Sequence, residues 1–245
     1  MPRVGRKAPG GYIYHVLNRG NRRERLFHKP ADYDAFLRML IEVLSAVPGV
    51  RLLAFCLMPN HWHLVLLPAE DGELSSFMLR LTTMHARRLH AHRHTGDEGG
   101  GGHIYQGRFK SFPVQAGDEL HLQTLIRYVE ANALRARLVR RARDWRWGSL
   151  RLRLGLLAGL PDDTKQLLSP MPIDLPRNWE ATVDAGMPVD ETVAIRTSIA
   201  RGRPYGSDAW VQRTAARLEL EFTLRRRGRP TKANAQRRRR TRSLK

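Results

Sequence analysis

The sequence predicts an α+β fold: a ferredoxin-like βαββαβ core with a mainly antiparallel sheet, one extra C-terminal helix and a basic extension. Stretches in which apolar residues alternate, typical of strands, and stretches in which they recur every three or four residues, typical of helices, follow in the order strand, helix, strand, strand, helix, strand, helix. The two middle strands are separated only by a Pro-Asn turn signal. This order with a central hairpin is the ferredoxin-like pattern.

The first half of the chain supplies four elements. Residues 12–19 are rich in β-formers and end at a Gly-Asn turn. Residues 32–45 carry apolar side chains at helical spacing and stop before Pro48-Gly49. Two apolar runs, 51–57 and 61–67, then flank the turn and predict the hairpin.

The second half completes the pattern. A helix is expected over 74–92, with an apolar face and a strongly basic opposite face. A glycine-rich loop separates it from a strand expected over 105–114, in which Arg108 and Lys110 would share one face. A third helix starts near Asp118, a suitable N-cap, and continues beyond Val129.

Composition favours a polyanionic partner. The 245 residues contain 43 Lys and Arg against 23 Asp and Glu, for a net charge of +20 and a pI near 11.3. Nucleic acid is the first candidate for such a partner and a membrane surface the second. No apolar stretch approaches the roughly 18–20 residues that span a bilayer, and the N-terminus lacks a signal-type apolar core. We therefore expect a cytoplasmic, nucleoid-associated protein.

The chain divides into four regions by composition. Residues 1–10 form a basic arm, 11–150 the main domain, 151–200 a linker or extension, and 201–245 a basic tail. A short helix is expected over 207–220. The last stretch, from Arg225 to Lys245, has eleven basic residues and no acidic one. We expect the tail to be largely disordered when free.

Four residues of the main domain predict chemistry. His61 and His63 are two positions apart on a strand, so both imidazoles point to one face. Tyr128 and Asn132 are four positions apart on a helix and share a face as well. Two imidazoles and an amide oxygen leave coordination positions open for water and phosphate, which suits Mg²⁺ or Mn²⁺. A tyrosine hydroxyl is a weak nucleophile that such an ion would assist by polarising the phosphate.

Several motifs, in this order and spacing, resemble those of the single-tyrosine HUH transposases, in particular the branch of REP-associated tyrosine transposases. The resemblance spans about residues 11–150. Its motifs are Tyr14-His15-Val16, Arg19-Gly20-Asn21, the run from Cys56 to His63, the run from Gln106 to Ser111, and the run from Arg127 to Asn132.

The resemblance implies roles for these residues. His61 and His63 would bind the divalent ion, with Asn132 as its third ligand. Tyr128, on the catalytic helix, would attack DNA to leave a 5′-phosphotyrosine and a free 3′-hydroxyl. Ala133 and Arg137 depart from the family pattern, because they stand where the family usually has proline and glycine.

Further cationic residues are expected to contact DNA. Arg19, Arg108 and Lys110 lie in or beside the catalytic motifs. The tail contains two Arg-Gly-Arg-Pro units, extended cationic segments that can lie in a narrow minor groove. By similarity they would help to recognise a tetranucleotide beside a DNA hairpin. The arginines of these units are Arg201, Arg203, Arg227 and Arg229.

The function predicted from the sequence is a metal-dependent DNA strand transferase, acting as a monomer or homodimer on single-stranded DNA beside hairpin-forming repeat elements. Two alternatives stay open. The first is a protein of the same fold that binds such hairpins without cutting them. The second is a hydrolytic metalloenzyme in which His61, His63 and a third histidine hold zinc.

Overall fold

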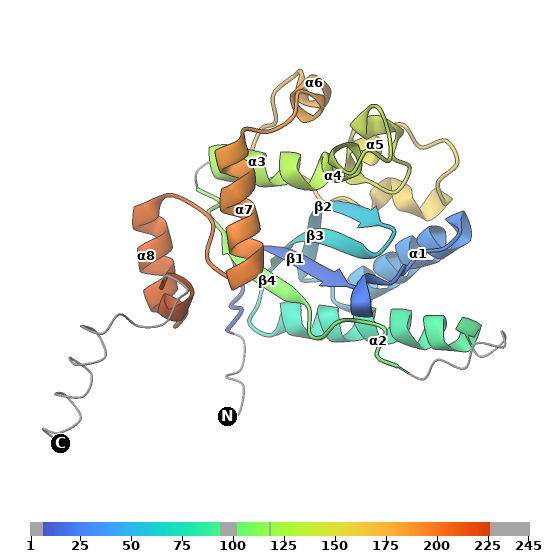
Figure 1. Ribbon diagram of the computed structural model, residues 1–245, viewed down its shortest axis with the longest axis horizontal. Helices are drawn as coiled ribbons and strands as arrows, with labels where there is room; N and C mark the ends of the chain where they lie inside the picture. The colour runs from blue at the N-terminus through green and yellow to red at the C-terminus, as the bar shows by residue number, and fades with distance from the viewer. Residues whose placement is uncertain (1–6, 94–101, 118, 226–245) are drawn as a thin grey trace, which may run out of the picture.

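The computed structural model describes residues 7–93, 102–117 and 119–225, and its centre is one four-stranded antiparallel sheet (Figure 1). The strands occur in the order β2-β3-β1-β4 across the sheet. This confirms the ferredoxin-like arrangement predicted from the sequence. Their bounds are β1 Ile13–Arg19, β2 Val50–Met58, β3 His61–Pro68 and β4 Lys110–Val114.

The register of the central strands brings together the sequence motifs on β1, β2 and β3. β1 and β3 pair antiparallel so that Arg19 lies opposite His61 and Leu17 opposite His63. In the β2-β3 hairpin, Met58 pairs with His61 across the predicted turn. The histidines therefore lie at the start of a central strand, with a neighbouring strand on each side.

Two long helices cover one face of the sheet, α1 (Pro30–Ala46) and α2 (Glu73–Arg93) (Figure 1). Both were predicted from their apolar spacing. Alternate strand residues such as Val16, Trp62 and Leu64 are buried against them in a single core. Because neighbouring residues of a strand point to opposite faces, the residues flanking Trp62 must face the other way.

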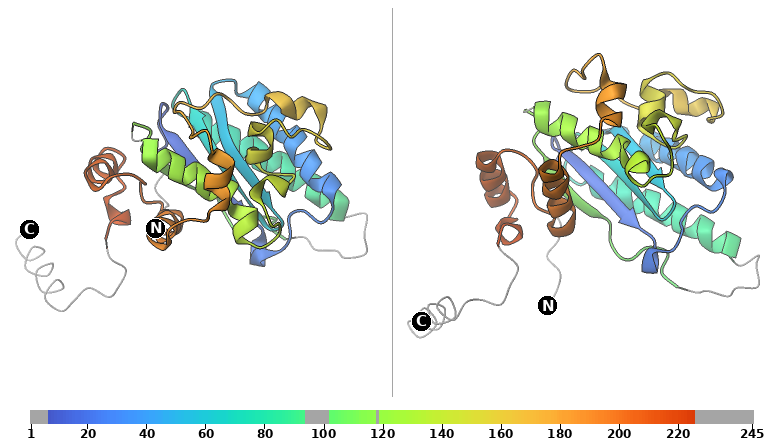
Figure 2. Two further views of the ribbon diagram at one scale, coloured as in Figure 1. Left: turned by 90° about the horizontal axis from the view of Figure 1, so that it is seen from above. Right: turned by 45° about the horizontal axis from the view of Figure 1, so that its top comes forward.

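The opposite face is covered by α3 (Glu119–Glu130) and α4 (Asn132–Arg135) (Figure 2). Ile13, Val65 and Phe112 form a second core with the apolar side of α3. The start of the helix predicted at Asp118 cannot be compared, since residue 118 lies outside the described residues.

The structure corrects the single helix predicted to carry both Tyr128 and Asn132. The helix is interrupted at Ala131, whose backbone angles are φ −80° and ψ 3°. Tyr128 therefore belongs to α3 and Asn132 begins α4. The interruption coincides with a hydrogen bond of 2.8 Å that Arg135 Nη1 donates to the Tyr128 carbonyl. A side chain that hydrogen-bonds to a backbone carbonyl of the helix is a known cause of such a break.

The strand predicted over 105–114 is shorter in the structure. Regular pairing with β1 begins only at Lys110, and Tyr105 makes an isolated bridge to Gly20. Arg108 therefore precedes β4, and the expectation that it shares a strand face with Lys110 is wrong.

Residues 151–225 form more structure than the linker and disordered tail expected from the sequence. Their helices are α5 Ser149–Arg153, η3 Asp162–Gln166, α6 Trp179–Asp184, α7 Val189–Arg201, α8 Asp208–Arg217 and η4 Glu221–Thr223. Trp179, Val183 and Ile195 are buried in the α3 core, so this segment completes the domain. The helix predicted over 207–220 is confirmed as α8. In the described residues, no helix is long and apolar enough to cross a membrane.

Candidate active site

Two histidines lie side by side on β3, on the face covered by α3. The ring centroids of His61 and His63 are 5.0 Å apart, with their planes at 78°. His63 is buried, whereas His61 is partly exposed near the strand end. The alternation of the strand, which buries Trp62 on the far side, is what aims both rings in one direction.

Each histidine has one ring nitrogen held by a neighbour. The Nδ1 of His63 lies 2.8 Å from Nε2 of the buried His15 on β1. The Nδ1 of His61 lies 2.6 Å from the Oδ1 of Asn60, and since that oxygen can only accept, His61 donates. Among the described residues, neither Nε2 atom has a hydrogen-bond partner, so both are available to a ligand. A ring oriented through its other nitrogen is the usual arrangement of a metal-binding histidine.

The environment keeps both imidazoles neutral. Burial, assisted by Arg19 and Arg135, lowers the pKa of His61 to about 4. Burial also lowers the pKa of His63 well below its usual value, with contributions from His15 and His61. Neutral imidazoles offer lone pairs to a cation, so the histidine pair fits a divalent ion in its donor chemistry.

Tyr128 reaches the same place from α3. Its ring centroid is 6.0 Å from that of His63 and 6.5 Å from that of His15. The side chain is only 5% exposed. In the described residues, no protein group hydrogen-bonds to the Tyr128 hydroxyl. The structure thus brings the predicted nucleophile and the histidine pair together.

Arg135 joins Tyr128 to Asn132, and the sequence argument did not include it. Its guanidinium Cζ lies 3.9 Å from the centroid of the Tyr128 ring. While Nη1 donates to the Tyr128 carbonyl, Nη2 donates to Asn132 Oδ1 at 3.2 Å. Burial lowers the pKa of Arg135 from its usual value. The sequence could have indicated the contact of Arg135 with Asn132, because side chains three residues apart on one helix meet.

Asn132 fits the expected third ligand less well than the histidines do. Its side chain is buried, and its oxygen already accepts from Arg135. Its Nδ2 is enclosed without a hydrogen-bond partner in the described part of the chain. The amide orientation follows from Arg135, because a rotated amide would place two donors against each other.

His15 and Asn60 are the other site residues that sequence reasoning missed. The side chain of His15 points to the same face of the sheet as the histidine pair. Its contact with His63, however, joins residues 48 positions apart in the sequence. Only the β1-β3 register reveals it. Asn60 was read as a turn residue, and in the structure its side chain also holds His61.

Three predicted DNA-contacting residues line one hollow of about 320 Å³ at the ends of β1 and β4. They are Arg19, Arg108 and Lys110, and Ile199 of α7 lies on its rim. Arg19 on β1 lies opposite His61 on the neighbouring strand β3, so this basic hollow adjoins the histidine pair. The hollow therefore places three cationic side chains beside the histidine pair.

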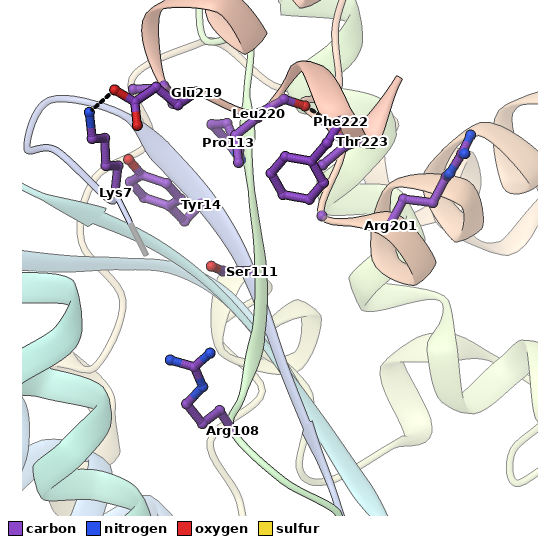
Figure 3. Close-up of a pocket in the computed structure, with 12 residues that line it drawn as sticks. Lys7, Tyr14, Arg108, Ser111, Pro113, Arg201, Glu219, Leu220, Phe222 and Thr223 are labelled. Carbon is purple, nitrogen blue, oxygen red and sulfur yellow. Dashed lines mark hydrogen bonds and ion pairs between the residues drawn. The ribbon is translucent and has the colours of Figure 1, made fainter. Parts of the chain in front are cut away.

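The tail arginines lie elsewhere. Arg201 lines a separate pocket of about 210 Å³ between β4 and the C-terminal segment, together with Tyr14, Arg108 and Phe222 (Figure 3). Nη2 of Arg203 lies 3.8 Å from Oδ1 of Asp208, the first residue of α8. The predicted residues Arg227 and Arg229 lie outside the described residues.

The zinc alternative lacks its third histidine. Within residues 7–93, 102–117 and 119–225, no group of three or more His, Cys, Asp or Glu side chains is arranged to hold a metal. His15, the nearest additional histidine, directs its Nε2 at His63 rather than at a common centre.

Comparison with known proteins identifies the family. A family model described as IS200-like transposase matches residues 10–132, half of the chain. The chain belongs to the IS200-like transposase family. Membership assigns this IS200-like transposase a transposase-type function, and the matched region contains all four residues predicted to carry the chemistry. Among curated proteins, none matches the sequence significantly.

Two solved structures are similar to this transposase. One is a REP-associated tyrosine transposase bound to a REP hairpin, with 18% identity, a TM-score of 0.49, and coverage of 72% of this chain and 93% of the other. The second is a putative transposase from Deinococcus radiodurans R1, with 20% identity, a TM-score of 0.36, and coverage of 51% and 93%. At these values neither likeness carries a functional argument.

Proposed function

We propose that this transposase cleaves single-stranded DNA beside a hairpin and transfers the strand through a covalent 5′-phosphotyrosine at Tyr128. The observation that carries the proposal is the position of the Tyr128 ring, 6.0 Å from His63, in a member of the IS200-like transposase family. A nucleophile beside a histidine pair that can hold a divalent ion is suited to attack a phosphate bound to that ion.

The reaction needs no external energy source. The Tyr128 hydroxyl oxygen attacks phosphorus and loses its proton to solvent, while the bond from phosphorus to the 3′-oxygen breaks. That oxygen takes up a proton and leaves as a 3′-hydroxyl. The 5′-phosphate stays on Tyr128, so the phosphodiester free energy is retained. Attack by another 3′-hydroxyl reverses the chemistry and joins the strands.

His61 and His63 would hold a divalent ion, Mg²⁺ or Mn²⁺, through their Nε2 atoms. Such an ion supplies Lewis-acid polarisation of the phosphate when bound. The hydrogen bonds that Nδ1 of His63 makes with His15 and that Nδ1 of His61 donates to Asn60 fix the ring orientation that this role needs.

The basic hollow supports single-stranded DNA as the substrate. Arg19, Arg108 and Lys110 supply positive charge beside the histidines, and the net charge of +20 adds a general attraction for phosphate. Recognition of a hairpin and of a flanking tetranucleotide by Arg201, Arg203, Arg227 and Arg229 is proposed from the resemblance of the tail motifs. An active site built from one chain or from two copies is compatible with this scheme.

The test is a covalent-adduct assay. The full chain is incubated with end-labelled hairpin oligonucleotides that carry different flanking tetranucleotides, in the presence of Mg²⁺ or Mn²⁺. We expect a denaturant-resistant protein–DNA adduct with the wild type and none with Tyr128→Phe. A chelator should abolish the adduct.

Tyr33→Phe is the matched control. Tyr33 stacks on Trp147 at 4.0 Å in the core on the other side of the sheet, and loss of its hydroxyl should leave the adduct unchanged. An adduct that persists in Tyr128→Phe overturns the proposal. Hairpin binding by the wild type without an adduct under either ion favours the non-cleaving alternative.

A further inference from the structure

The orientation of the Asn132 amide sets it apart from an ordinary metal ligand. Its oxygen accepts a hydrogen bond from Arg135 Nη2 at 3.2 Å, and its nitrogen has no partner among the described residues. The Asn132 side chain is buried, and its nitrogen is enclosed with it. The amide therefore has a used acceptor and an unused donor.

The occupied oxygen is a poor position for a second cation. A divalent ion binds a ligand oxygen at roughly 2.0–2.2 Å. An ion on Asn132 Oδ1 would lie close to the guanidinium already on that atom, and like charges repel strongly in a buried site. Arg135 is held there by further contacts, with the Tyr128 carbonyl, the Tyr128 ring and the Met187 sulfur.

The unused nitrogen is suited to an anion. An amide N–H can only donate, and a buried donor without a partner is costly unless an acceptor arrives. In the proposed reaction the incoming acceptors are phosphate oxygens. Arg135 contacts both side chains, with its Cζ 3.9 Å from the centroid of the Tyr128 ring and its Nη2 3.2 Å from Asn132 Oδ1, so the amide lies beside the residue that would carry the phosphate.

We propose that Asn132 donates a hydrogen bond from Nδ2 to the phosphate transferred to Tyr128, and that His61 and His63 bind the divalent ion without it. Arg135 is the positioning residue that turns the amide nitrogen toward this phosphate. The inference rests on the proposed function for its phosphate, but its statement about the ion is independent of cleavage.

The first experiment measures the affinity of Mn²⁺ for the DNA-free full chain by calorimetry. Asn132→Ala should bind Mn²⁺ within about twofold of the wild type, whereas His61→Ala and His63→Ala should bind it at least tenfold more weakly. A tenfold weaker affinity of Asn132→Ala for Mn²⁺ would identify the Asn132 oxygen as a metal ligand. That result would overturn the inference, whether or not the protein cleaves DNA.

The second experiment measures adduct formation at saturating Mn²⁺. Asn132→Asp keeps the size and the oxygen but replaces the donor by a negative acceptor. Loss of one such donor lowers rates by about 10²-fold, so we expect a decrease of this order. Retention of the wild-type rate would overturn the donor role. Gln123→Ala removes an amide on α3 and should keep the wild-type rate, because that amide bonds to the Asp174 carbonyl.

A third experiment, which measures DNA binding without cleavage, separates this inference from the proposed function. In a Tyr128→Phe background, which cannot form the adduct, Asn132→Asp should weaken binding of the uncleaved hairpin oligonucleotide by about tenfold. If the wild type forms no adduct, this measurement still decides the donor role, and equal affinity of the two proteins would overturn it.

Arg135 is tested by non-additivity. If it acts through Asn132, Arg135→Leu should lower the adduct rate, and the Arg135→Leu/Asn132→Ala double variant should be no slower than the slower single variant. Multiplicative losses would show that Arg135 acts independently of Asn132 and would exclude its role as the positioning residue.

Discussion

Arg137 ends α4 in a backbone conformation that favours glycine. Its φ is +56°, in the left-handed region. Two hydrogen bonds define the helix end: Arg137 N–H to the Leu134 carbonyl at 2.9 Å, and Leu138 N–H to the Ala133 carbonyl at 3.0 Å. These bonds form a Schellman motif, whose left-handed position is usually glycine. The departure at residue 137 noted in the sequence is thus a site of local strain.

Arg137→Gly should therefore stabilise the protein. Removing the side chain relieves a left-handed cost of about 1–2 kcal/mol, partly offset by the greater freedom of glycine in the unfolded chain. We expect a net gain of about 0.5–1 kcal/mol in the free energy of unfolding, measured by urea denaturation. Arg137→Ala removes the charge but keeps the strain, so an equal gain in that variant would contradict this explanation.

At the level of elements, the position of α3 depends on one buried carboxylate. Glu130 Oε1 accepts from Ser149 Oγ at 2.7 Å and from Arg153 Nε at 3.1 Å, and Oε2 accepts from Trp179 Nε1 at 2.7 Å. The Glu130 side chain is fully buried. The carboxylate thus ties α3, two residues beyond Tyr128, to α5 and α6.

Glu130→Ala should destabilise the fold by about 3 kcal/mol, because it leaves Arg153 and the Trp179 N–H without their acceptor in the interior. Urea denaturation measures the change. Glu180→Ala is the control, since its ion pair with Arg143 at 3.0 Å is about one-third exposed and should contribute less than about 1 kcal/mol. Similar losses in both variants would argue against a special role for the buried network.

At the level of the whole molecule, the two faces of the sheet bury histidines whose pKa values are lowered. Burial lowers the pKa of His15 to about 3, of His61 to about 4 and of His85 to about 3, and moves that of His63 in the same direction. The unfolded chain therefore binds more protons than the folded one below about pH 6.5. Folding stability must decrease as the pH falls from there toward 3.

The free energy of unfolding, measured without divalent ions, should decrease between pH 7 and pH 6 by about 0.7 kcal/mol for each such histidine. His85 is the one to vary, because it lies on the α1–α2 side of the sheet, hydrogen-bonded to the Tyr105 hydroxyl at 2.6 Å. His85→Gln should reduce the decrease by about 0.7 kcal/mol, whatever its effect at pH 7. An unchanged decrease would mean that His85 does not contribute to it.

Local periodicity was sufficient to predict much of this molecule. The βαββαβ order, the placement of His61 and His63 on one strand face and the helix that carries Tyr128 all follow from spacings of two to four residues. The bounds of α1, α2 and the hairpin were predicted to within a few positions. Such features depend on neighbours in the chain, which a sequence displays directly.

The remaining features depend on partners far apart in the sequence. His15 meets His63 only because β1 and β3 pair in one particular register, and Trp179 reaches Glu130 only because the C-terminal segment folds back over α3. The contact of Arg135 with the Tyr128 carbonyl likewise spans the helix break at Ala131. The sequence thus predicted the groups that are proposed to perform the chemistry. Their hydrogen-bond partners, which determine which atom of each group is free to act, required the folded chain, because packing and not periodicity assigns those contacts.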